Sequence, residues 1–109
     1  MRSDLAGTLS ALADPTRLAV IRLLGKKPRR SSEVAAALEV PRPAMSRHLR
    51  ILRKAGIVEE ASLEEDARVR MYQLRAQPFS ELRDWLDEVE AFWGEQLQAF
   101  KAHAERRRR

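Results

Sequence analysis

The amino-acid sequence predicts a mainly α-helical domain of about five helices with one small β-hairpin. Aliphatic and aromatic residues recur three and four positions apart along most of the 109 residues, which is the spacing of one helix face. A short stretch around position 70 instead alternates between polar and apolar side chains, as a strand does. Proline and glycine punctuate the helical segments. The length suits a single domain, since most domains have about 100–150 residues.

Two short helices are expected at the start of the chain. Asp14 is a strong N-cap residue, and Pro15 suits the first position of the second helix because its missing N–H would have no partner there. Gly25 is expected at the C′ position. The density of aliphatic residues between Pro15 and Gly25 predicts a largely buried helix. The first helix carries one apolar stripe, formed by Leu5, Leu9 and Leu12.

A basic connector, residues 26–30, leads to a short third helix. Ser31 or Ser32 can cap its start, because a serine hydroxyl accepts a hydrogen bond from a backbone N–H of the first turn. The helix is expected to end near Glu39, since Pro41 disfavours helical backbone in the residue before it.

A fourth helix is expected from Pro41–Pro43 to about Ala55, with Gly56 as its stop. One face is apolar and formed by Met45, Leu49 and Leu52. The other faces are basic or polar and carry Arg42, Ser46, Arg47, Arg50, Arg53 and Lys54. This pattern predicts a helix that packs on one side and offers hydrogen-bond donors on the other.

The hairpin and the last helix complete the chain. Residues 57–58 open a strand, residues 64–66 form a polar turn, and residues 69–74 form the return strand. A long helix then starts at Pro78 and runs to about residue 103. Its apolar face is large for so small a domain and consists of Phe79, Leu82, Trp85, Leu86, Val89, Phe92, Trp93, Leu97 and Phe100.

Charge is distributed unevenly along the chain. Residues 1–58 carry a formal charge of +8, residues 59–105 carry −7, and the last four residues are all arginine. A concentration of basic charge is typical of nucleic-acid binding, although a solvated helical surface also explains it. We expect residues 1–105 to form the domain and residues 106–109 to form a basic tail that is either disordered or a DNA-contacting arm.

Several functional classes are excluded or disfavoured. The chain has no cysteine, which excludes disulfides, thiolate metal sites and a cysteine nucleophile. No apolar run approaches the roughly 18 residues of a membrane span, and no export signal opens the chain, so a cytoplasmic protein without membrane partners is expected. No glycine-rich phosphate loop or catalytic triad is recognisable, so we predict neither enzymatic activity nor a cofactor.

The order of elements is that of a winged helix-turn-helix domain, in which a basic helix enters the DNA major groove and a hairpin flanks it. His48 is ambiguous and is interpreted as a packing or phosphate-contacting residue. Arg68 and Arg70 flank the hairpin, where one of them could pair with the acidic turn instead of DNA. The candidate DNA-binding residues are Arg42, Ser46, Arg47, His48, Arg50, Lys54, Arg68 and Arg70. The alternative is a protein-interaction module whose basic face meets an acidic partner and binds DNA only nonspecifically.

Three segments carry a resemblance to a known family. The sequences LSALADPTRLAVIRLL (9–24), SRHLRILRKAGIVEE (46–60) and RVRMYQL (68–74) are similar to signatures of the ArsR/SmtB repressors, in the same order and spacing. The resemblance implies a homodimeric repressor that binds a palindromic operator and leaves it when an effector binds. It also implies that the first and last helices form the dimer interface, for which the candidates are Leu5, Leu9, Leu12, Trp85, Val89, Phe92 and Trp93.

Two departures from the family separate this chain from its metal sensors. Many members bind metal through a cysteine motif where this chain has Arg30-Ser31-Ser32, and a second family site needs histidines where the final helix has only His103. We therefore predict no metal site and a member of the non-metal branch, with an unknown small-molecule effector left open. Trp85, Phe92 and Trp93 could line an effector pocket, but we interpret them as core and dimer seam.

Overall fold

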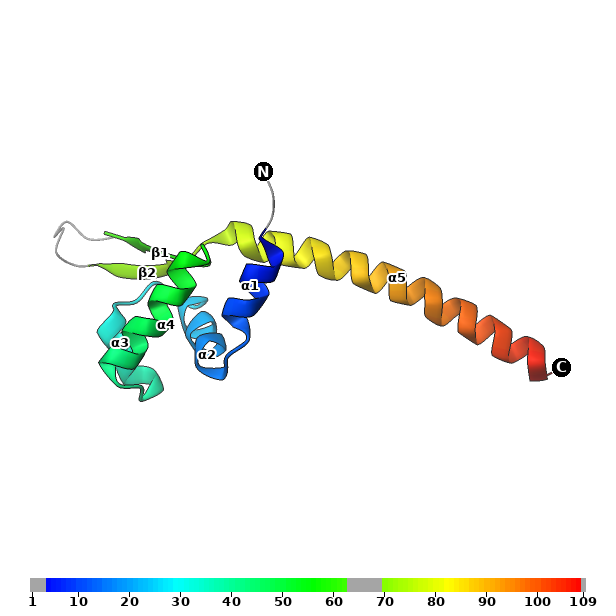
Figure 1. Ribbon diagram of the computed structural model, residues 1–109, viewed down its shortest axis with the longest axis horizontal. Coiled ribbons are helices and arrows are strands. Elements are labelled where there is room, and N and C mark those ends of the chain that lie inside the picture. Colours follow the sequence, from blue (N-terminus) through cyan, green and yellow to red (C-terminus); the bar gives the residue numbers. More distant parts are fainter. Residues whose placement is uncertain (1–3, 63–69, 109) are drawn as a thin grey trace. The chain divides into compact units, whose positions relative to one another are not determined.

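The computed structural model describes residues 4–62 and 70–108 and confirms the predicted helical class with a small antiparallel hairpin. The elements follow in the order shown in Figure 1: α1 (Leu5–Leu12), α2 (Pro15–Leu24), α3 (Ser31–Leu38), α4 (Arg42–Lys54), β1 (Val58–Ala61), β2 (Met71–Leu74) and α5 (Ala76–Arg108). The chain divides after Phe79 into two compact units. The first holds α1 to α4, the hairpin and the start of α5, and the second is the remainder of α5.

The starts of α1 and α2 are fixed by aspartate caps. Asp4 accepts a hydrogen bond from the Gly7 N–H at 3.1 Å, and Asp14 accepts one from the Arg17 N–H at 3.0 Å. The Arg17 N–H is the main cause that lowers the pKa of Asp14. The cap predicted at Asp14 is therefore confirmed. Gly25 differs from the prediction, because it is the C-cap residue in right-handed conformation and not a left-handed C′ residue.

The prediction that α2 is largely buried is wrong. Only Val20 and Leu24 are buried in this helix, and 44% of Leu18 is exposed. In α1, the residues that are buried are Thr8 and Ala11, one position before each of the last two leucines of the predicted stripe. A helix of two turns rotates by about 100° per residue, so this small offset turns the leucine stripe toward the edge of the contact.

The start of α3 corrects the predicted serine caps. Ser31 is the first helical residue, and Arg30 occupies the N-cap position. A carboxylate does the capping instead, because Glu33 accepts a hydrogen bond from the Arg30 N–H at 3.2 Å. The turn between α3 and α4 passes through Glu39, whose φ of 54° lies in the left-handed region.

Helix α4 has the boundaries that the sequence predicted. Pro41 is its N-cap residue and offers no side-chain hydrogen bond. At the other end Gly56 has a φ of 75°, the left-handed conformation that terminates many helices and that suits glycine.

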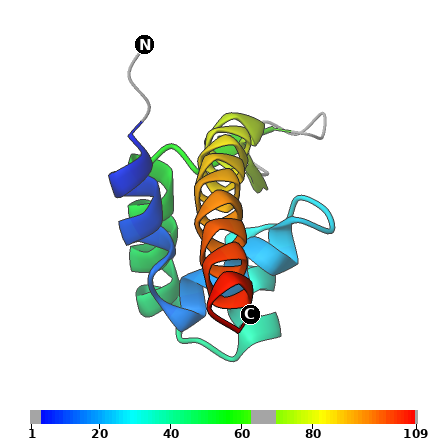
Figure 2. The same cartoon turned by 90° about the vertical axis from the view of Figure 1, so that its right-hand side faces the viewer.

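One hydrophobic core lies among α1, α2, α3, α4 and the start of β1. Its fully buried side chains include the predicted stripe of α4, which confirms that assignment. Helix α4 packs against α1, α2, α3 and β1, and Figure 2 shows α1 alongside α4. The buried residues are Ala11, Val20, Leu24, Val34, Ala35, Met45, Leu49, Leu52, Ile57 and Val58.

The hairpin pairs β1 with β2 in antiparallel register, with Val58 opposite Leu74 and Glu60 opposite Tyr72. The connector before α3 also takes part. Arg29 and Tyr72 exchange two backbone hydrogen bonds, with N···O distances of 3.1 and 2.7 Å. The predicted turn at residues 64–66 and the first residue of the predicted return strand, Val69, lie outside the described residues.

Helix α5 is longer than predicted at both ends. It begins at Ala76, so Pro78 lies in its first turn, where a missing N–H costs no helical hydrogen bond. It continues through Arg108, so three of the four residues predicted to form a tail are helical. Arginine is a good helix former, and a cation in the last turn interacts favourably with the helix dipole. Across the part of the chain described, no helix has the length and apolar character needed to cross a membrane.

Candidate nucleic-acid interface

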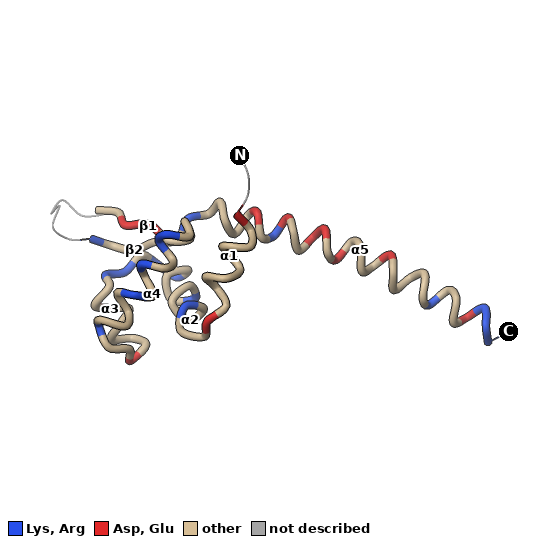
Figure 3. The backbone as a smooth tube through the Cα atoms, viewed as in Figure 1, with Lys and Arg blue, Asp and Glu red and all other residues tan. Residues whose placement is uncertain are grey.

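Helix α4 presents a basic surface opposite its buried stripe. Arg42, Ser46, Arg47, Arg50 and Lys54 are exposed, and Figure 3 shows the basic positions along this helix. Among residues 4–62 and 70–108, the arginines at 42, 47 and 50 form no ion pair with an acidic group. Their five-donor guanidinium groups are therefore available to an external acceptor. The buried stripe opposite holds this surface on a fixed support.

Glu60 links the end of α4 to the hairpin. Its carboxylate accepts hydrogen bonds from Tyr72 Oη at 2.7 Å, from Arg53 Nη1 at 2.9 Å and from Arg70 Nη1 at 3.2 Å. These contacts hold the pKa of Glu60 below its ordinary value, with the Tyr72 hydroxyl as the largest cause. The pKa of Tyr72 is raised, first by burial and then by its bond to Glu60. The carboxylate therefore positions the hairpin relative to the helix.

His48 is tied to α2. Arg17 Nη1 lies 3.3 Å from Nδ1 of His48, and Arg17 Nε donates to the carbonyl oxygen of Ala11. Because arginine can only donate, Nδ1 must be the acceptor, and the neutral ring then carries its proton on Nε2. The sequence left the role of His48 open between packing and phosphate contact. In the structure His48 is half-buried, connects α4 to α2 and keeps one N–H donor.

A polar hollow of about 210 Å³ lies between α4, the start of α3 and the hairpin. Ser31 and Ser46 supply hydroxyl groups, and Arg50 and Arg53 supply guanidinium groups. Such donors match the oxygen atoms of a phosphodiester. The acidic Glu60 in the same lining is already occupied by its three donors.

The structure places six of the predicted DNA-binding residues on α4 and leaves Arg70 apart from them. Arg70 is at the start of the second strand, where it is paired with Glu60. Arg68 lies outside the described residues. The sequence did not single out Arg17, Glu60 or Tyr72 as positioning residues. No sequence signal indicated the contact between Arg17 and His48.

The predicted dimer residues differ in exposure. On α5, Trp85, Phe92 and Trp93 are exposed and Val89 is half-buried. Phe92 and Trp93 meet edge to face with centroids 5.8 Å apart. On α1, Leu9 is exposed and Leu5 is half-buried, whereas Leu12 packs against the core. In total, α5 exposes six large apolar side chains: Trp85, Leu86, Phe92, Trp93, Leu97 and Phe100.

No group of three or more histidine, aspartate or glutamate side chains with metal-binding geometry occurs among the described residues. The carboxylates of α5 are spread along the helix, as Figure 3 shows, and His103 is exposed. The donor set that a metal would need is therefore not brought together in these parts of the chain.

Comparison with known proteins agrees with this geometry. Residues 12–61 match a family model described as a helix-turn-helix domain. The chain is 46% identical over 56 residues to the HTH-type transcriptional repressor SmtB of Mycobacterium tuberculosis, an alignment that covers 50% of this chain and 42% of that protein. It therefore spans less than half the length of this relative.

Two longer similarities extend beyond the helix-turn-helix segment. The chain is 37% identical over 90 residues to the HTH-type transcriptional regulator Rv2034 of M. tuberculosis, covering 83% of this chain and 78% of that protein. Among solved structures, an ArsR-like transcriptional regulator from Rhodococcus sp. RHA1 superposes with a TM-score of 0.74 at 30% identity. That match covers 89% of each chain.

Proposed function

Because the chain belongs to the ArsR/SmtB family of winged helix-turn-helix transcriptional regulators, we propose that it is a sequence-specific DNA-binding repressor that acts as a homodimer on a palindromic operator. The observation that carries the proposal is α4, which fixes its apolar stripe in the core and leaves its opposite basic surface without acidic partners among the described residues. An α-helix of this kind fits the major groove of B-DNA.

Within α4, the roles follow from position. Arg47 and Arg50 are exposed near the middle of the helix and contact bases or phosphates. Arg42 and Ser46, nearer the start, contact the backbone, and Lys54 adds a phosphate contact at the end. His48 has its Nδ1 engaged by Arg17, so its Nε2–H donates to a phosphate oxygen. Affinity is therefore salt-dependent, with the specific part supplied by a few base contacts.

The hairpin acts as the wing. Arg70 pairs with Glu60 at 3.2 Å, and the Arg70 side chain is 69% exposed, so solvent weakens the ion pair. A phosphate can therefore compete for the exposed guanidinium of Arg70. Arg68, which lies outside the described residues, is proposed as a further phosphate contact. Glu60, held also by Arg53 and Tyr72, keeps the wing at a fixed distance from α4.

Dimerisation explains the apolar surface of α5. A monomer rarely exposes this many large apolar side chains on one helix, and 57% of Trp93 and 72% of Phe100 are exposed. A second copy buries them, together with Leu5 and Leu9 of α1. The two recognition helices of a twofold dimer would meet half-sites separated by about one turn of DNA, roughly 10 bp. A repressor that acts on such an operator would work in the cytoplasm.

The proposal is tested by fluorescence anisotropy with duplexes obtained by selection from a random library. Arg50→Ala is expected to weaken binding to the selected duplex by about tenfold to a hundredfold, because one good base contact contributes about 1–3 kcal/mol. Arg83→Ala is the matched control, since it removes the same charge from an exposed position of α5. It should change affinity less than about twofold at moderate salt. Equal effects of the two variants contradict the assignment of α4.

A further inference from the structure

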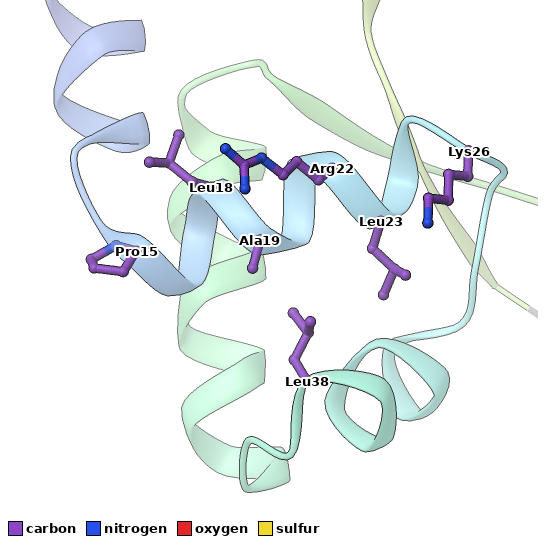
Figure 4. A pocket seen from close by; sticks show the side chains of 7 residues that line it. All are labelled: Pro15, Leu18, Ala19, Arg22, Leu23, Lys26 and Leu38. Atoms are coloured by element: carbon purple, nitrogen blue, oxygen red, sulfur yellow. The ribbon is translucent and has the colours of Figure 1, made fainter.

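A second candidate site lies away from α4. A cavity of about 370 Å³ opens between α2 and the end of α3, and Figure 4 shows its lining. Small-molecule sites commonly have volumes of about 300–1,000 Å³, so the cavity is large enough for a small organic molecule. None of its lining residues comes from α4 or the hairpin. The cavity therefore shares no residue with the proposed DNA-binding surface.

The wall of the cavity is apolar. Leu38 of α3 points toward Ala19 and Leu23 of α2, as Figure 4 shows. Leu18 lines the same cavity and is 44% exposed, whereas Val20 and Leu24 of this helix are buried in the core. Burying the rest of a leucine side chain is favourable by about 25 cal/mol for each Å² removed from water. An apolar ligand body gains this free energy at Leu18.

Two cations border the apolar wall. Arg22 lies on α2 and Lys26 lies four residues further along the chain, and both line the cavity. In Figure 4 the Arg22 side chain extends toward Leu18 and the Lys26 side chain toward Leu23. Within residues 4–62 and 70–108, neither side chain forms an ion pair or a hydrogen bond. Both also lie near the end of α2, where a cation interacts favourably with the helix dipole. The helix dipole explains why cations occur at this end of α2, but it does not explain the leucine side chains that line the cavity beside them.

We propose that this cavity binds a small amphipathic organic anion, such as a carboxylate with a short chain or one or two rings. Arg22 binds the carboxylate, Lys26 adds a second positive charge to the lining, and the apolar body lies against Leu18, Leu23 and Leu38. Arginine suits this role because its planar guanidinium offers two parallel N–H donors to a carboxylate. Complementary charge and apolar wall together select an anion over a neutral molecule of equal shape. The aromatic side chains of α5, the alternative ligand site considered from the sequence, were interpreted as core and dimer seam, whereas this site is on α2 and α3.

The test uses the full chain without DNA, so its outcome is independent of the proposed repressor function. Naphthalene-1-acetate is titrated into ¹⁵N-labelled protein, and naphthalene-1-acetamide serves as the uncharged probe of the same shape. We expect amide shifts confined to α2 and the end of α3, with the acid binding about tenfold more tightly than the amide. A charge-assisted hydrogen bond at a partly exposed site gives a difference of this size.

Variants then separate the site from general electrostatic attraction. Arg22→Gln and Lys26→Gln should each weaken binding of the acid several-fold and leave the amide unchanged. Lys27→Gln is the matched control, because Lys27 is exposed, adjacent in sequence and outside the lining. It should bind the acid as the parent does.

Three results would overturn the proposal. The first is the absence of amide shifts on α2 at up to about 5 mM acid, a concentration above the dissociation constant expected for such a ligand. The second is an equal affinity for the acid and the amide. The third is an equal loss of affinity for the acid in Lys27→Gln. Broadening of α2 amides that depends on protein concentration, without ligand binding, would show that a second copy covers the cavity instead.

Discussion

Replacing Tyr72 with phenylalanine removes a single hydroxyl from the network that connects the wing to α4. That hydroxyl donates to Glu60 at 2.7 Å, and the carboxylate is about 20% exposed. A hydrogen bond to a charged group contributes about 1.5–3 kcal/mol. Glu60 retains Arg53 and Arg70 and can be partly rehydrated, so the loss should fall below this range. We expect Tyr72→Phe to lower the free energy of unfolding by about 1–1.5 kcal/mol.

Urea unfolding monitored by tryptophan fluorescence and circular dichroism measures this loss. With a slope of about 1.5 kcal/mol per M, the midpoint should fall by roughly 0.7–1 M at fixed protein concentration. Gln73→Met is the matched control, since it removes the neighbouring cross-strand bond from Gln73 Nε2 to Glu59 Oε1, which is 2.9 Å long but exposed. It should change stability by less than about 0.5 kcal/mol. Similar losses in both variants would refute the role assigned to the Glu60 network.

The same network makes a pH-dependent contribution. The pKa of Glu60 is lowered in the folded chain, chiefly by the Tyr72 hydroxyl. Its ionised form therefore stabilises the fold fully above the ordinary pKa of 4.5, and this contribution is lost as the pH falls through the folded value. The cost of Tyr72→Phe should be smaller near pH 3 than at pH 7. An unchanged cost across this interval would show that the hydroxyl does not act through the carboxylate.

Three further changes test separate parts of the fold. Gly56→Ala should lower the free energy of unfolding by about 1–2 kcal/mol, because the φ of Gly56 is +75°. Gly94→Ala should raise it by up to about 1 kcal/mol, because Gly94 lies in open space on α5. Equal shifts of the two urea midpoints would contradict this contrast. Arg17→Met should change the ¹⁵N shifts of the His48 ring, which would stay constant if Nδ1 were not an acceptor. A chain ending at Phe79 should be monomeric in light scattering at concentrations where the full chain is dimeric, and a dimer of equal stability would exclude α5 as the interface.

The local signals in the sequence predicted the recognition helix closely. The stripe of Met45 and Leu49 specified the buried face of α4, and Gly56 specified its end, because periodicity and a left-handed terminus depend on neighbouring residues alone. Helix α2 was predicted less well, since Leu18 fits the apolar pattern but faces the cavity. Which side of a short helix is covered depends on the elements packed against it, and periodicity cannot supply that information.

The sequence predicted the cations of the candidate site but not the residues that position them. Arg47 and Arg50 follow from a basic helix face opposite an apolar one. The contact between Arg17 and His48 joins residues 31 positions apart, and the Glu60 network joins three segments. Such contacts depend on tertiary packing, which no local spacing encodes. Residue 68 lies outside the described part of the wing, so its assignment to DNA stays a prediction.

Selection of bound duplexes from a random library by the purified full chain tests the central claim most directly. A homodimeric, sequence-specific repressor predicts an enriched motif with twofold symmetry and half-sites about 10 bp apart. The selected duplex should bind about a thousandfold more tightly than a scrambled one near physiological salt. No enriched motif, together with equal affinities that vanish at moderate salt, would contradict the account and show that the basic surface of α4 serves a different partner.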